Sequence, residues 1–136
     1  MWADLGEYII KLLEGKSDTS QKVVEIGVGK LFDVSNYLNE YNNLYNNLNF
    51  IMTDIAPAND TVVYDDITNP KLNLYKDAKV IYSIRPPSEL QPYLGKIIDK
   101  TGSILIIKPL FNEDININKE MSLVNYKKAV FYEYSP

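Results

Sequence analysis

The stretch Val23-Val24-Glu25-Ile26-Gly27-Val28-Gly29 decides the fold. Its apolar residues predict a buried strand that ends in an acid and runs directly into two glycines, and a helical pattern follows from Phe32. A strand, a glycine turn and a helix N-terminus together form a site for a phosphate or a carboxylate. The third glycine of a dinucleotide fingerprint would fall at Phe32. The acid at the strand end instead favours a ligand with an ammonium group and hydroxyls, such as S-adenosylmethionine.

Each part of this stretch also has a purely structural interpretation. An isolated pair of glycines usually makes only a tight strand-to-helix turn. Ligand binding by Gly27 and Gly29 is favoured because Glu25 precedes them and a helix follows. Glu25 alternatively caps a helix or pairs with a lysine, although an acid at the carboxyl edge of a central strand more often lines a site.

Composition limits the classes of protein to which the chain can belong. A length of 136 residues predicts a single domain, 1–136. The net charge of -4 argues against general affinity for nucleic acid or anionic membranes. The chain has neither Cys nor His, which excludes thiolate chemistry and removes the commonest general base and zinc ligand, so no metal site is expected. Charged residues interrupt the N-terminal apolar pattern, so no membrane span is expected and the predicted location is cytoplasmic.

Alternating apolar segments and turn residues predict a parallel α/β sheet. Strands are expected at 22–26, 49–53, 61–64, 78–83 and 103–107, followed by a hairpin of 122–125 and 129–134. Helices are expected at 3–14, at 71–76 and at 88–100, and a further helix of about 12 to 14 residues is expected to begin near Phe32. Gly15 is the expected stop of the first helix. Residues 112–120 are expected to form a loop or a frayed helix. Ser88 is the expected N-cap of the last helix, with Gln91 at the capping-box position. Right-handed crossovers then place the strand ends, and any ligand, along one edge of the sheet.

This order of features resembles the class I S-adenosylmethionine-dependent methyltransferases. Glu25-Ile-Gly-Val-Gly29 is similar to their first motif, Asp54 to the acid that ends their second strand, and Asp65-Asp66 to the acid after their third. The segment 81–90, Ile-Tyr-Ser-Ile-Arg-Pro-Pro-Ser-Glu-Leu, falls where their fourth motif lies. The whole chain is similar to an uncharacterised family of small archaeal methyltransferase-like proteins. The resemblance implies a three-layer Rossmann-like α/β sandwich, with a mostly parallel sheet and an antiparallel C-terminal hairpin.

The resemblance also implies which residues bind S-adenosylmethionine. Asp54 would accept hydrogen bonds from both ribose hydroxyls, or else it only starts the turn that leads to Pro57. Asp66 would accept from the adenine amino group, with Ile55 and Ile67 as apolar walls, or else Asp65-Asp66 is a solvated turn. The residues expected to bind the cofactor are Glu25, Gly27, Gly29, Asp54 and Asp66.

Arg85 is the only arginine of the chain and stands at the predicted end of the fourth strand. Its planar fork would hold a carboxylate or phosphate of a substrate, or the carboxylate of the cofactor. The equal alternative is an internal salt bridge with Glu89 or Asp54. In amino-group methyltransferases an acid or amide precedes the Pro-Pro of the fourth motif, whereas here Arg85 precedes Pro86-Pro87. The resemblance therefore supports cofactor binding better than methyl transfer, and it assigns no catalytic residue.

The leading hypothesis is a small S-adenosylmethionine-binding, methyltransferase-like protein whose substrate the sequence does not reveal. The alternative is a non-catalytic nucleotide-binding or regulatory module, and a third possibility is a purely structural or interaction domain. The expected partner is a small-molecule ligand, without a strong nucleic-acid signal and without a membrane. A homodimer through the terminal hairpin or the N-terminal helix fits each hypothesis.

Overall fold

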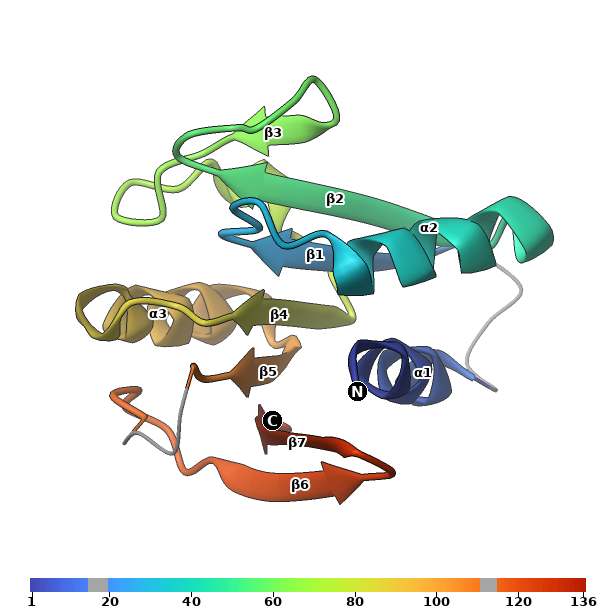
Figure 1. Cartoon of the computed structure of the whole chain (residues 1–136). Coiled ribbons are helices and arrows are strands. Elements are labelled where there is room, and N and C mark those ends of the chain that lie inside the picture. The colour runs from blue at the N-terminus through green and yellow to red at the C-terminus, as the bar shows by residue number, and fades with distance from the viewer. Residues whose placement is uncertain (15–19, 111–114) are drawn as a thin grey trace.

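The protein forms one seven-stranded sheet with helices on both faces (Figure 1). The structure, a computed structural model, describes residues 1–14, 20–110 and 115–136. The strand order is β3-β2-β1-β4-β5-β7-β6; the first five strands in this order pair in parallel, and β7 is antiparallel to both of its neighbours. The strands are β1 (Gln21–Ile26), β2 (Leu48–Asp54), β3 (Val62–Tyr64), β4 (Val80–Ile84), β5 (Ile104–Lys108), β6 (Ser122–Tyr126) and β7 (Ala129–Tyr134). The predicted Rossmann-like fold with its C-terminal hairpin is confirmed.

Two core layers enclose the sheet. The helices α1 (Trp2–Leu13) and α2 (Asp33–Tyr45) cover one face, and α3 (Gln91–Thr101) covers the other. Successive side chains of a strand point to opposite faces, so Val23 of β1 packs with α1 and α2, while Val24 packs with α3. Both residues are fully buried, which explains why two consecutive valines occupy the middle of β1 instead of an alternation of apolar and polar residues.

The predicted helix at 88–100 begins later than the sequence indicates. Residues Ser88–Leu90 form a single 3₁₀ turn, and the N-cap of α3 is Leu90 rather than Ser88, without a side-chain capping bond. The capping box fails because Gln91 is fully buried and used elsewhere. Its amide nitrogen donates to the carbonyl of Pro86 at 3.2 Å, and its oxygen accepts from the backbone N–H of Asn116 at 2.7 Å. Gln91 therefore fastens two loops to the start of α3.

The other helix predictions differ less from the structure. The helix expected at 71–76 is a 3₁₀ turn at Leu72–Leu74. Residues 115–120 contain no helix, so this part of the segment expected at 112–120 is a loop. Gly15, the expected stop of the first helix, and residues 112–114 lie outside the described residues. Within the described ranges, no helix is long and apolar enough to cross a membrane, and the cytoplasmic location stays a prediction.

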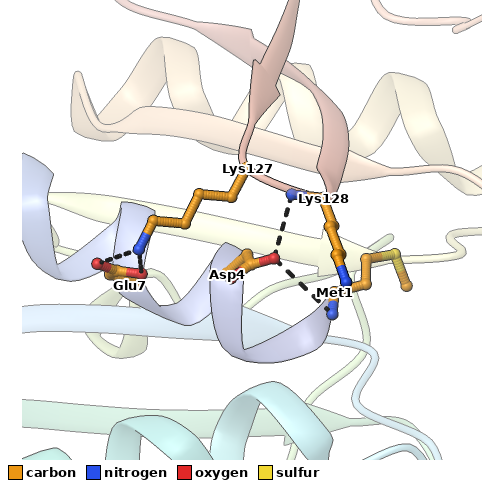
Figure 2. Close-up of polar contacts among 5 residues, drawn as sticks. All are labelled: Met1, Asp4, Glu7, Lys127 and Lys128. Atoms are coloured by element: carbon orange, nitrogen blue, oxygen red, sulfur yellow. Dashed lines mark hydrogen bonds and ion pairs between the residues drawn. The ribbon is translucent and has the colours of Figure 1, made fainter.

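Polar contacts join the first helix to the last two strands (Figure 2). The Lys127 ammonium donates to Glu7 Oε2 at 2.7 Å, and the backbone N–H of Lys128 donates to Asp4 Oδ2 at 3.1 Å. The Tyr8 hydroxyl also donates to Glu133 Oε1 at 2.6 Å. These contacts connect opposite ends of the chain and hold α1 against the β6–β7 hairpin.

Candidate functional site

The glycine turn after β1 is tied to the end of the neighbouring strand β2. Gly27 and Gly29 have φ angles of 71° and 57°, a left-handed conformation that favours glycine. The backbone N–H groups of Gly27 and Val28 both donate to the Thr53 carbonyl, at 2.9 and 3.2 Å. The N–H of Gly29 donates to Asp54 Oδ2 at 2.8 Å. These three amides already have acceptors, so none of them is free to bind an anion.

Asp54 uses both carboxylate oxygens to shape the backbone around it. Oδ2 accepts from Gly29, and Oδ1 accepts from the N–H of Ala56 at 2.8 Å. The second bond is a local turn of the kind expected as the structural alternative for this residue. Because each carboxylate oxygen has a further lone pair, contact with a ribose stays a prediction. The negative charge at the turn disfavours a phosphate and favours hydroxyls or a cation.

A cavity of about 430 Å³ opens beside this turn, at the carboxyl ends of β1 to β4. This is the edge at which open α/β sheets bind ligands. Four of the six predicted site residues line the cavity, namely Gly27, Asp54, Asp66 and Arg85, whereas Glu25 and Gly29 do not. The expected apolar walls Ile55 and Ile67 are both present. A larger hollow of about 590 Å³ lies between α1 and α2, but it contains none of these residues.

A buried hydroxyl–carboxylate contact supports the floor of the cavity. The Tyr75 hydroxyl donates to Asp65 Oδ2 and lies 3.4 Å from Thr53 Oγ1, and Asp65 Oδ1 accepts from the backbone N–H of Lys71 at 3.0 Å. Burial, with Asp65 as hydrogen-bond partner, raises the pKa of Tyr75. Sequence reasoning missed this residue, because Tyr75 is one of eleven tyrosines and no local pattern marks it.

Asp66 differs from its neighbour Asp65 because it lies at the rim of the cavity. Its Oδ1 accepts from the backbone N–H of Thr68 at 2.9 Å and from the Thr68 hydroxyl at 2.7 Å. These hydrogen bonds lower the pKa of Asp66 below its ordinary value. Asp66 thus lines the cavity with a carboxyl group that favours its charged form, while Asp65 is committed to the framework.

Glu25 is buried behind the glycine turn. Glu25 is 1% exposed, and its side chain lies on the same face of the sheet as Val23 and Tyr82, the face covered by α1 and α2. The Tyr82 hydroxyl donates to Oε1 at 2.6 Å, and Oε2 has no hydrogen-bond partner among the described residues. Burial raises the pKa of Glu25 to about 8; the Tyr82 hydrogen bond opposes this shift and the charge of Asp54 adds to it. A direct ligand contact by Glu25 stays a prediction.

Arg85 has a strained backbone at the end of β4. Its φ is 57°, unusual for a residue with a side chain, and its N–H donates to the Lys108 carbonyl at 2.6 Å. The guanidinium carbon lies 5.6 Å from the ring centroid of Trp2, a cation–π contact with α1. The internal salt bridge of Arg85 with Glu89 or Asp54 that the sequence suggested as an alternative is not among the ion pairs of the described residues, so that prediction is wrong.

The family of the chain follows from comparison with known proteins. The model of the family described as "Uncharacterised protein family (UPF0146)" matches residues 2–136. The chain belongs to the UPF0146 family. A UPF0146 protein of Methanothermobacter thermautotrophicus is 42% identical over 134 residues, covering 98% of this chain and 95% of the relative. A UPF0146 protein of Methanocaldococcus jannaschii is 42% identical over 128 residues, covering 93% and 90%. The resemblance to a family of archaeal proteins is confirmed.

Solved structures extend the likeness of this UPF0146 protein to methyltransferases. The CurJ carbon methyltransferase aligns with a TM-score of 0.59 at 19% identity, over 79% of this chain and 34% of that chain. The DszA carbon methyltransferase aligns with a TM-score of 0.56 at 13% identity, over 82% and 36%. This chain thus spans about a third of those proteins. At such low identity the likeness establishes a methyltransferase-like fold alone. Within the described residues, no cluster of three His, Cys, Asp or Glu side chains is placed to hold a metal ion.

Proposed function

We propose that this UPF0146 protein binds S-adenosylmethionine or its demethylated product in the cavity beside the glycine turn. The observation that carries the proposal is the convergence of Gly27, Asp54 and Asp66 on one cavity of about 430 Å³ at the carboxyl edge of the sheet. This volume lies within the range of about 300 to 1,000 Å³ typical of small-molecule sites. The fold shared with carbon methyltransferases supports the same ligand. Bound S-adenosylmethionine would supply an activated methyl group.

The charges around the turn support this ligand over a dinucleotide. A pyrophosphate needs free backbone N–H groups at a glycine turn. Here the amides of Gly27, Val28 and Gly29 are occupied, and the Asp54 carboxylate stands among them. S-adenosylmethionine has no phosphate, and it carries a sulfonium, an ammonium and two ribose hydroxyls. We assign the ribose contact to Asp54 and the adenine amino contact to Asp66, with Ile55 and Ile67 as walls of the base site.

Isothermal titration calorimetry tests the proposal directly. We expect saturable heat with S-adenosylmethionine and S-adenosylhomocysteine, and a melting temperature that rises with their concentration, because a ligand that binds only the folded state stabilises it. NAD and ATP serve as matched ligands that carry adenosine together with phosphates. Stronger binding of NAD or ATP would contradict the proposal, as would the absence of heat with both sulfur compounds at millimolar concentration.

A non-catalytic binding module is the second candidate function. The observation that favours it is Arg85, which stands before Pro86-Pro87 in place of the acid or amide of the fourth methyltransferase motif. In addition, Asp65 is committed to Tyr75 and Asp54 to two backbone amides, so neither is a free base. Binding of S-adenosylmethionine without its conversion to S-adenosylhomocysteine across a panel of acceptors would favour this module over an enzyme.

Arg85 is proposed to contact an anionic group of the ligand or of a substrate. A non-glycine residue in left-handed conformation costs about 1 to 2 kcal/mol, and a following proline adds to the restriction. Such strain, retained at the wall of a cavity, is typical of a functional residue. Trp2 holds the guanidinium through its ring face and leaves the five N–H donors of the fork available.

Replacing Arg85 distinguishes an anion contact from a brace. If the fork binds the cofactor carboxylate, Arg85→Lys and Arg85→Ala weaken S-adenosylhomocysteine to a similar extent, because lysine lacks the bidentate geometry. Methylthioadenosine, which lacks the amino-acid part, should bind both variants like the unmodified protein. Calorimetry with the two ligands provides the measurement. Lower melting temperatures with unchanged affinity for both ligands would instead identify Arg85 as a brace against Trp2.

A further inference from the structure

The strand β6 forms an open edge of the sheet (Figure 1). It has no strand partner other than β7 within the described residues, whereas the opposite edge, β3, is only three residues long. The sequence of β6, Ser122-Leu-Val-Asn-Tyr126, contains no charge and no proline. Leu123 on this strand is 57% exposed. Edge strands of proteins that act alone usually carry charges, prolines or bulges that prevent pairing, and β6 carries none of these.

The hairpin geometry fixes which backbone groups of β6 face outward. Tyr126 pairs with Ala129 across the two-residue connection Lys127-Lys128, and such a connection is closed by a hydrogen-bonded pair. Hydrogen-bonded and non-hydrogen-bonded pairs alternate along an antiparallel ladder. Ser122, Val124 and Tyr126 therefore bond to β7, while Leu123 and Asn125 direct their N–H and C=O groups away from the sheet. Within the part of the chain that the structure describes, these four groups have no strand partner, so another strand can bond to them.

We propose that β6 pairs in antiparallel orientation with β6 of a second copy of this chain. Only the pairing of Leu123 with Asn125 of the other copy lets these outward groups bond reciprocally, and it places Val124 on the two-fold axis. Because β6 itself carries no charge, pairing two copies in this register sets no like charges opposite one another.

Apolar side chains on the same strands favour the same contact. Leu123 and Val130 are 57% and 38% exposed, and both lie on the face of the hairpin away from α1. In the proposed register Leu123 of one copy lies opposite Asn125 of the other, and Asn125 is the neighbour of Val130 on β7. In this register the Leu123 side chains of the two copies are diagonal neighbours on the same face of the sheet, so pairing withdraws apolar surface from water.

Single-cysteine variants test the register, because the natural chain has no cysteine. In Val124→Cys the two thiols face each other as a non-hydrogen-bonded pair, whose Cα atoms lie about 4.5 Å apart, within the range for a disulfide. We expect oxidation to yield a covalent dimer of twice the chain mass of 15.6 kDa. Leu123→Cys and Asn125→Cys are the matched controls, because position 123 of one copy lies opposite position 125 of the other copy, so a single cysteine at either position does not face its own counterpart. These controls should remain monomeric on denaturing gels.

A proline at the outward edge tests the backbone hydrogen bonds. The N–H of Asn125 is not used by β7, so Asn125→Pro should keep the hairpin and remove a donor of the interface. Asn125→Ala keeps that donor. We expect sedimentation equilibrium to give dimers for the natural chain and Asn125→Ala and monomers for Asn125→Pro, with equal far-ultraviolet circular dichroism. A natural chain that is monomeric at millimolar concentration would overturn the proposal, as would a dimer unaffected by Asn125→Pro or a disulfide formed equally well from position 123.

Discussion

Replacing Glu25 by glutamine should raise the free energy of unfolding at pH 8 by on the order of 3 kcal/mol. The residue is 1% exposed, one of its oxygens has no hydrogen-bond partner among the described residues, and burial raises its pKa to about 8. Folding at neutral pH therefore requires either burial of an unfavourable charge or uptake of a proton. The glutamine side chain would keep the shape of the neutral acid and retain an acceptor for the Tyr82 hydroxyl.

The sign of the pH dependence follows from the two pKa values of Glu25. The folded value of about 8 lies above the ordinary value of 4.5, so the folded state binds the proton more tightly. Stability from this group is fully present below pH 4.5 and is lost as the pH rises to about 8. The difference between Glu25→Gln and the natural chain should grow over this window. Urea unfolding across the window measures it, and a difference independent of pH would contradict the prediction.

Tyr82→Phe provides the comparison for Glu25→Gln. The Tyr82 hydroxyl favours the charged form of Glu25, so its removal should raise the pKa of Glu25 further and let the loss of stability continue to a higher pH. The two variants thus change the pH dependence in opposite directions. A general loss of packing would shift both unfolding curves equally at every pH, which separates it from the titration of Glu25.

Gly27→Ala should weaken binding of S-adenosylhomocysteine about tenfold or more, which corresponds to at least 1.4 kcal/mol. Gly27 lines the cavity, and the nearest atom to an added Cβ is Ser83 Oγ at 4.0 Å. The protein therefore has room for the methyl group, but the methyl group would take the space left for the ligand. The change also costs about 1 to 2 kcal/mol of stability because φ is 71°.

Gly102→Ala is the matched control for this prediction. Gly102 ends α3 with a φ of 70°, and an added Cβ there meets nothing within 4 Å. Both variants should show a similar drop in melting temperature, since both place alanine in the same conformation. Only Gly27→Ala should lose affinity, as measured by calorimetry. Equal affinity in the two variants would remove Gly27 from the ligand site and with it the main support for the proposed function.

Much of the architecture follows from local patterns in the sequence. Buried parallel strands are unbroken apolar runs such as Val23-Val24, and glycines and prolines separate them from the helices. The mostly parallel sheet and the antiparallel C-terminal hairpin that these runs predict are confirmed. The ends of the elements were less predictable, as Ser88 shows. Its spacing to Gln91 matches a capping box, but the Gln91 side chain is buried and makes hydrogen bonds to Pro86 and Asn116 instead of capping the helix at Ser88.

The meeting of Gly27, Asp54, Asp66 and Arg85 at one cavity could be predicted from their places in the chain, because the carboxyl ends of parallel strands lie at one edge of the sheet. The direction of each side chain, in contrast, depends on how the helices and the sheet pack together. In a strand that is buried on both faces, the pattern of polar and apolar residues does not show which face each side chain occupies. The sequence therefore could not predict that Glu25 lies behind the turn. The contact of Arg85 with Trp2 likewise depends on where α1 docks, which is set by packing between segments far apart in the chain.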